Sequence, residues 1–294
     1  MLKFFVSSVV ALAATTLAAA QDAAKWVEYK GQDGAGKGKN IIFVTGDDEY
    51  RGEESMPQMA KILAVRHGFD CTVLFAINKE TGAIDPATQD NIPGLEKLEN
   101  ADLMVLFLRF RQLPDDQMKH ILDYTNSGRP IVALRTSTHP FFYQDQTRQY
   151  AKWNWNSKDP AGGYGREVLG ETWVSHYGHH NVQATRGIVA PGMEGSPLVR
   201  GCEDIFGPSD VYEVRTLTGD SQPVCLGQVL TGMNPTDQPV ADKKELPITW
   251  TKTYTGSSGK TSRVFTTTMG HSYDFKSEGV RRMLVNGVYW AVGL

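Results

Sequence analysis

The sequence has few cysteines and no dense run of basic residues, and both shortages restrict what the protein can do. Only three cysteines occur among its 294 residues, and an odd number excludes a complete disulfide framework. None belongs to a Cys-x-x-Cys pair of the kind that binds zinc. The net charge is −3, and lysine and arginine are dispersed along the chain, which argues against nucleic acid as a partner.

The first twenty residues have the pattern of a signal peptide. Lys3 precedes an apolar run over 4–17, and the alanines at 18–20 form a small-residue cleavage site before Gln21. A membrane anchor would need about 20 apolar residues, more than this run offers. The sequence therefore predicts an exported protein, periplasmic or extracellular, that keeps no membrane attachment after cleavage.

Export would place the three cysteines in an oxidising compartment. Cys71 lies in the apolar stretch FDCTVLF and is expected to be a buried apolar residue. Cys202 and Cys225 could pair with each other or remain reduced, and the sequence leaves both states open.

Residues 40–294 are expected to form one domain after a polar segment, 21–39, that is poorly ordered in part. Apolar runs rich in β-branched residues alternate with stretches of helical spacing, which is the pattern of an α/β fold. A mostly parallel sheet with helices on both faces follows from this alternation. The expected strands are 40–46, 70–76, 101–109 and 129–136, and the expected helices are 55–68 and 114–128.

The second half of the domain is less regular. Residues 143–196 are polar, aromatic and glycine-containing, which is typical of a long functional insertion. Shorter strands and a final amphipathic helix are expected after it. These strands are 210–217, 222–230, 246–254 and 262–270, and the helix is 277–293.

Polar residues follow several of the expected parallel strands. Ligands bind open parallel sheets beyond the carboxyl ends of the strands, so these residues are expected to meet at one edge. They are Asp47, Asp48, Glu49, Arg109, Arg111, the stretch 135–139 and His271.

The acids in TGDDEYRGEES (45–55) allow two interpretations. Asp47, Asp48 and Glu49 can hold sugar hydroxyls or a hard cation, or they can favour the amino terminus of the next helix. The stretch contains neither G-x-G-x-x-G nor a Walker lysine, so no nucleotide is indicated.

Two further stretches could carry catalysis. Ser137 follows a buried strand as a nucleophile would, with His139 or His271 as its base, although helix capping by 136–138 is the favoured interpretation. His271 ends the last strand, and Asp274 is close enough in sequence to orient its ring. The rival interpretation of His271 is a surface histidine that caps the final helix.

The stretch WVSHYGHHN (173–181) contains three of the seven histidines. His176, His179 and His180 could hold a divalent metal such as zinc, although Gly178 disfavours the helix that would align them. Alternatively they contact a sugar beside Tyr177 and a group of tryptophans, or they are ordinary loop residues. The tryptophans are Trp153, Trp155 and Trp173.

The chain resembles the ThuA-like (trehalose-utilisation) family, whose fold is that of class I glutamine amidotransferases, a flavodoxin-like sheet. The resemblance extends in order over 40–294, and its most specific part is the ending RVF…GH…F…NGVYWA. Further matching segments are IIFVTGDDEYRGEES, ADLMVLFLRFRQLPDDQMKHILDYTNSGRPIVALRTSTHPF, GREVLGETWVSHYGHHN and SPLVRGCEDIFGPSDVYEV.

The resemblance also shows what the chain has lost. Amidotransferases carry a cysteine where this chain has 136–138, and a His-x-Glu pair where it has GHSYD. Without that cysteine, glutamine hydrolysis is excluded. The family instead implies disaccharides and their keto forms as substrates.

The leading hypothesis is an exported enzyme that processes a saccharide or keto-sugar as a hydrolase, lyase or isomerase. His271 would be the general acid or base and Arg135 would hold an oxyanion. The alternatives are a non-catalytic carbohydrate-binding protein that relies on Trp153, Trp155, Tyr164 and Trp173, and a metal-dependent hydrolase whose zinc is held by histidines.

Overall fold

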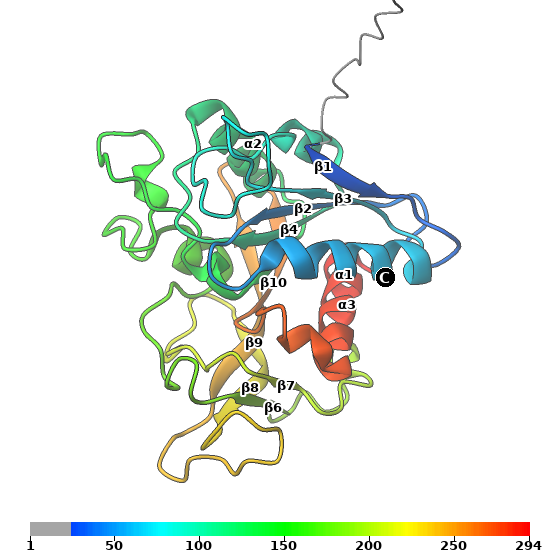
Figure 1. The fold of residues 1–294 in the computed structure, drawn as a ribbon, viewed down its shortest axis with the longest axis vertical. Coiled ribbons are helices and arrows are strands. Elements are labelled where there is room, and N and C mark those ends of the chain that lie inside the picture. Colours follow the sequence, from blue (N-terminus) through cyan, green and yellow to red (C-terminus); the bar gives the residue numbers. More distant parts are fainter. Residues whose placement is uncertain (1–24) are drawn as a thin grey trace, which may run out of the picture.

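The protein is seen here in a computed structural model that describes residues 25–294. One continuous ten-stranded sheet runs through it in the order β1-β3-β2-β4-β5-β10-β9-β8-β6-β7 (Figure 1). The expected signal peptide, residues 1–20, lies outside the described residues. Among residues 25–294, no helix combines the length and apolar character needed to cross a bilayer.

Five parallel strands form one half of the sheet and confirm the predicted α/β class. Their side chains are almost entirely buried, because helices or loops cover both faces. Consecutive side chains of β2 enter opposite cores, Ile41 and Phe43 on one face and Ile42 and Val44 on the other. The strands are β2 (Asn40–Gly46), β3 (Asp70–Leu74), β4 (Leu103–Leu108), β5 (Ile131–Leu134) and β10 (Thr261–Thr267).

The helices cover the two faces as predicted. α1 (Gly52–His67) and α3 (Glu278–Val292) supply Met59, Leu63 and Met283 to one core, and α2 (Asp115–Asn126) supplies Ile121 to the other. α1 ends at Gly68, whose φ of 82° suits the left-handed cap expected there.

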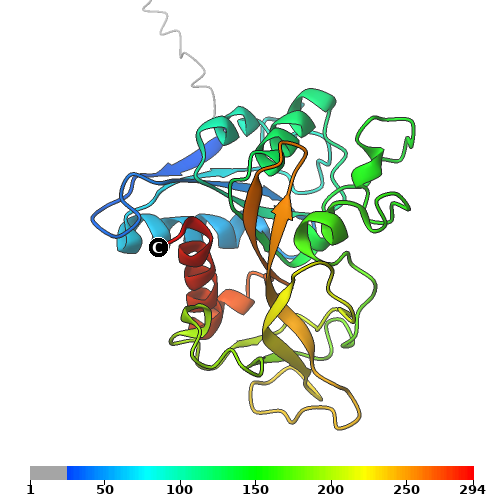
Figure 2. The ribbon, with the colours of Figure 1, turned by 180° about the vertical axis from the view of Figure 1, so that it is seen from behind.

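The other half of the sheet is antiparallel. It contains β9 (Leu246–Thr255), β8 (Gln222–Val229), β6 (Thr185–Val189) and β7 (Phe206–Gly207). β10 joins the halves, because it pairs with β5 in parallel and with β9 in antiparallel fashion. Figures 1 and 2 show the antiparallel strands extending away from the parallel half.

Three expectations about local structure need correction. β1 (Trp26–Tyr29) pairs with β3 at the sheet edge, inside the polar segment 21–39, for which no strand was expected. Residues 210–217 do not form a strand, apart from one bridge between Tyr212 and His176. The irregular insertion contains β6, and a short π-helix, Gly165–Leu169.

The structure confirms the expectation that Cys71 is a buried residue. Within residues 25–294, Cys71, Cys202 and Cys225 are all free and buried. Burial raises the pKa of the Cys225 thiol to about 12, so this group stays protonated and unreactive at neutral pH.

Candidate functional site

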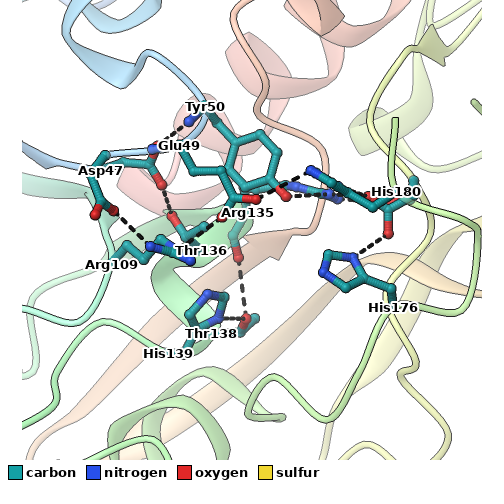
Figure 3. A network of polar contacts seen from close by, with 12 residues as sticks. Asp47, Glu49, Tyr50, Arg109, Arg135, Thr136, Thr138, His139, His176 and His180 are labelled. Atoms are coloured by element: carbon teal, nitrogen blue, oxygen red, sulfur yellow. Dashed lines mark hydrogen bonds and ion pairs between the residues drawn. The ribbon is translucent and has the colours of Figure 1, made fainter. Parts of the chain in front are cut away.

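The carboxyl ends of β2, β4, β5 and β10 bring distant parts of the chain together, as the topology predicts (Figure 3). The first link joins the ends of β2 and β5, where the Thr136 hydroxyl donates to Asp47 Oδ2 at 2.5 Å. The second is Tyr50, whose ring packs against His180 at 6.0 Å and against His271 at 5.7 Å between ring centroids. His271 and the histidine-rich segment therefore lie on the same side of the molecule.

A buried ion pair lies beneath this surface. The guanidinium of Arg135 donates through Nη2 to Asp210 Oδ1 at 2.7 Å, and both side chains are fully buried. Arg135 also donates through Nη1 to the carbonyl oxygens of Asp210 and Thr268, at 2.7 and 2.9 Å. The rings of Tyr50 and Tyr212 flank the guanidinium, with centroids 4.5 and 3.9 Å from its carbon. The pair stabilises the fold, because the loss of either residue would leave the charge of the other buried without a partner.

Asp210 orients two histidines as well. His176 Nδ1 lies 2.7 Å from Asp210 Oδ2, and His180 Nδ1 lies 3.1 Å from Asp210 Oδ1. Burial acts to raise the pKa of Asp210, but the charge of Arg135 and the bonds to the two imidazoles outweigh it and lower this pKa below its ordinary value. A carboxylate that stays ionised accepts the Nδ1 protons and leaves Nε2 of each ring facing away from it.

Seven side chains contact one another in a closed series that we call the contact ring: Glu49, Arg109, Phe110, Trp155, Trp173, His176 and His180. Its polar part begins at Arg109, whose Nε lies 3.0 Å from Glu49 Oε2. The other oxygen of Glu49, Oε1, lies 3.3 Å from His180 Nε2, and the rings of His180 and His176 are 4.9 Å apart. Asp48 pairs with Arg109 at 2.9 Å just outside the contact ring.

Aromatic side chains complete the contact ring. The guanidinium of Arg109 lies 4.7 Å from the Phe110 ring, and Phe110 contacts Trp155 at 5.9 Å between centroids. Trp155 contacts Trp173 at 5.6 Å, and Trp173 contacts His176 at 5.6 Å. The three aromatic rings are half-buried. The contact ring thus consists of Glu49, Arg109, Phe110, Trp155, Trp173, His176 and His180.

The backbone fixes the tautomer of His271. The amide N–H of Tyr273 donates to His271 Nδ1 at 3.0 Å, so in the neutral ring the proton is on Nε2. Burial lowers the pKa of His271, against the opposing attraction of Asp274, and the neutral form is therefore favoured near pH 7. In this form His271 is a hydrogen-bond donor through Nε2–H.

Three predicted catalytic residues have structural roles instead. Arg135 is fully buried and its terminal nitrogens are bonded to protein atoms, so it does not reach a ligand. Ser137 is fully buried, donates to Leu106 O at 2.9 Å and accepts from Leu108 N at 3.2 Å, so it ties β5 to β4 and is no exposed nucleophile. Asp274 accepts from the backbone N–H groups of Gly270 and His271, at 2.8 and 3.0 Å, and holds the loop and not the imidazole ring.

Two residues expected to bind substrate are buried beneath the site. Asp47 accepts from the backbone N–H groups of Glu49 and Tyr50 and shapes the acidic loop; burial raises the pKa of its carboxyl. His139 packs between Phe110 and Trp173 at 4.9 and 5.5 Å, and burial holds its pKa well below that of a free histidine. A neutral, buried His139 supports the aromatic rings above it.

Four other predicted residues lie away from the site. His179 is exposed, and its backbone N–H donates to Gln183. The Tyr177 ring faces Lys243 and Arg215, at 4.6 and 5.8 Å. Trp153 and Tyr164, two of the four aromatics of the binding-protein alternative, are buried in the core beside α2.

Two residues that position the histidines, Asp210 and Tyr50, were not predicted from the sequence. Asp210 lies in the stretch SDVYEV, where its neighbours suggested a strand and no motif marked the acid. Tyr50 stands among the acids of 47–49, and an aromatic residue that follows charged residues gives no sign of burial. Within the described residues, the only group of three that could hold a metal ion is His176, His180 and Asp210, so Asp210 replaces His179 in the predicted set.

Comparisons with known proteins agree with this architecture. A family model described as ThuA, trehalose utilisation, matches residues 40–291. A ThuA-like protein from Bacteroides uniformis superposes with a TM-score of 0.55 at 14% identity, over 90% of this chain and 95% of that one. A second, from Parabacteroides merdae, has a TM-score of 0.51 at 15% identity, over 86% and 90%. These likenesses concern the fold alone, and a search of curated proteins found no match.

Proposed function

This chain belongs to the ThuA family, and from that premise we propose that it processes a saccharide or keto-sugar at the contact ring. The reaction would be a hydrolysis, an elimination or an isomerisation. The observation that carries the proposal is the division of the contact ring into a polar part, formed by Glu49, Arg109, His176 and His180, and an aromatic part.

A sugar has the surface that such a ring suits. Its C–H faces are apolar and stack on aromatic rings such as Trp155 and Trp173, while its hydroxyls need charged or polar partners. Glu49 and Arg109 supply an acceptor and a donor side by side, 3.0 Å apart. The family description, trehalose utilisation, supports the same ligand class.

In the proposed reaction the histidines have different roles, one as a hydrogen-bond donor and the others as proton acceptors. The Nε2–H of His271 is placed to donate to an oxygen that gains negative charge, such as the carbonyl oxygen of a keto-sugar. Nε2 of His176 lies across the ring from the Nδ1 that contacts Asp210, so it is the ring atom left to exchange a proton with a ligand hydroxyl, while Nε2 of His180 contacts Glu49. The donor and acceptor groups meet around Tyr50.

A substrate screen tests this function. Purified mature protein is incubated with disaccharides and their keto derivatives, with and without chelator, and products are followed by mass spectrometry. Binding to a sugar without any product would favour the non-catalytic binding protein. No binding and no product across the screen would contradict the proposal.

For the substrate so found, Trp173→Ala should raise KM about tenfold, because an aromatic face lost from the ligand costs about 1.4 kcal/mol. Trp26→Ala is the matched control, since Trp26 lies in β1 against Lys97. Equal KM values for native protein and Trp173→Ala would rule out stacking at this position.

We also propose export of the protein. The pattern of residues 1–20 is that of a signal peptide, so the mature chain recovered from outside the cytoplasm should begin at Gln21. Intact-mass measurement of that chain gives the answer, and an unprocessed Met1 would refute export by this route.

A further inference from the structure

A groove opens where β6 and β7 meet the start of α3, at the lower end of that helix in Figure 1. Its volume of about 810 Å³ lies within the range of roughly 300–1,000 Å³ that is usual for small-molecule sites. The residues that line it include Arg186, Ile205, Phe206, Pro208, Tyr273 and Lys276. None of these residues belongs to the contact ring, so the groove extends the surface that a ligand can occupy.

Tyr273 connects the groove to His271. The backbone N–H of Tyr273 donates to His271 Nδ1 at 3.0 Å, and the two rings lie 5.2 Å apart between centroids. Tyr273 is 48% exposed, and its side chain forms part of the groove surface. A molecule that contacts His271 can therefore extend past Tyr273 into the groove.

Much of the groove surface is apolar. Ile205 is buried, Phe206 and Pro208 are half-buried, and Pro235 adds a further apolar side chain. Small-molecule sites are lined mostly by apolar and aromatic side chains, with a few polar groups that fix the orientation of the ligand. An aromatic ring suits such a surface, because its flat faces bury a large apolar area.

Two cations also line the groove. Arg186 donates through Nη2 to the carbonyl oxygen of Pro235 at 2.7 Å, and the ammonium group of Lys276 lies 4.4 Å from the centroid of the Tyr273 ring. Within residues 25–294, neither cation forms an ion pair with a carboxylate. Asp204 is the one acid among the lining residues in this part of the chain, so two positive charges face one negative charge. The excess of positive charge favours an anionic group in the groove.

Hydrogen bonds hold the walls of the groove together. Asp274 accepts from the backbone N–H of Ser209 at 3.2 Å and from its hydroxyl at 2.6 Å, which ties the segment after β7 to the segment that carries Tyr273. The Ser277 hydroxyl donates to the carbonyl oxygen of Asp204 at 2.7 Å. Because these segments are joined before a ligand arrives, binding costs little conformational freedom.

We propose that the groove binds an aromatic group that carries a carboxylate and is attached to the sugar unit at His271. The substrate class is then the glycoside of an aromatic acid, with its ring against Phe206 and its carboxylate beside Lys276. The ligand of the groove is inferred from the groove alone, whereas the attachment of that ligand to a sugar rests on the proposed function.

Titration of the mature protein with benzoate, followed by the chemical shifts of backbone amides, tests the groove without any sugar. Benzoate should shift the signals of groove residues such as Phe206 and Lys276. Benzyl alcohol, which lacks the charge, should bind about threefold to fivefold more weakly, and acetate, which lacks the ring, should cause much smaller shifts. The proposal would be overturned by the absence of benzoate binding, by equal affinity for benzyl alcohol, or by equal shifts with acetate.

Two variants test the residues that are expected to contact benzoate. Lys276→Gln should weaken benzoate binding about threefold to fivefold, because it removes the charge, and Phe206→Ala should weaken it about fivefold, because it removes the apolar face. Lys260→Gln is the matched control, an exposed lysine in the turn between β9 and β10, and should bind benzoate like the native protein. Equal losses for the two lysine variants would contradict the role of Lys276. A dimer in sedimentation that Phe206→Ala dissociates would assign the groove to a second copy of the chain and overturn the proposal.

The attachment to a sugar is tested with two glycosides of the sugar found in the substrate screen. The para-carboxyphenyl glycoside should have a KM about tenfold lower than that of the methyl glycoside, and Lys276→Gln should raise the first KM more than the second. Equal KM values for the two glycosides in the native protein would overturn the attachment. A screen without any substrate would refute the proposed function, while benzoate binding would still decide the ligand of the groove.

Discussion

The His271→Asn variant should lose turnover of the substrate by about 10²–10⁴-fold in kcat, the usual contribution of a positioned proton-transferring group. The reason is that the bond from the Tyr273 amide to Nδ1 leaves the proton on Nε2, and in the proposed function this Nε2–H donates to the reacting oxygen. Asparagine can still accept from Tyr273 N–H through its side-chain oxygen but has no group in the place of Nε2. Steady-state kinetics on the sugar found in the screen give the measurement.

The fold should survive this change. His271 is only half-buried and packs against Tyr50 and Tyr273, so the melting temperature should stay within a few degrees of the native value. His179→Asn supplies the control for a histidine outside the site and should leave kcat unchanged. A His271→Asn protein with native kcat would exclude His271 from the chemistry.

Replacing Arg135 with methionine should destabilise the protein by about 3–5 kcal/mol, the range measured when one member of a buried ion pair is removed. The substitution leaves the Asp210 carboxylate buried without its guanidinium, and it leaves the carbonyl oxygens of Asp210 and Thr268 without their donor. Denaturant unfolding measures the change in free energy of unfolding.

An exposed ion pair provides the comparison. Arg148 and Asp115 are 2.6 Å apart, with 37% and 48% of their side chains exposed, so Arg148→Met should lower the free energy of unfolding far less than Arg135→Met does. Adding Asp210→Asn to Arg135→Met should recover part of the loss, because the unpaired charge is removed. Equal costs for the Arg135 and Arg148 variants would show that the buried pair does not stabilise the fold.

Much of the sheet could be predicted because its strands are buried on both faces. NIIFVTG and ADLMVLFLR are apolar runs, and the structure has strands at both places. β1 was not predicted because WVEY is a short edge strand without a fully buried residue, so its sequence lacks a continuous apolar run. Residues 210–217 alternate as a strand would, but Val211 O instead accepts from Tyr177 and Gly178 in a loop that shapes the site.

The place of the site was predictable, but the direction of its side chains was not. Strand order implies that residues after β2, β4, β5 and β10 meet at one edge. It does not reveal that Arg135, at φ 43°, turns inward beneath the site. Nor does it mark Asp210, whose importance arises only from three partners distant in sequence, Arg135, His176 and His180.

The position of β10 at the junction of the two half-sheets has a consequence for biosynthesis. Residues 261–267 follow β5 and β9 in the sequence, and they alone pair with both of these strands. Every member of the contact ring is synthesised before them. A nascent chain that ends before Thr261 therefore contains all of these residues but lacks the strand that joins the two half-sheets.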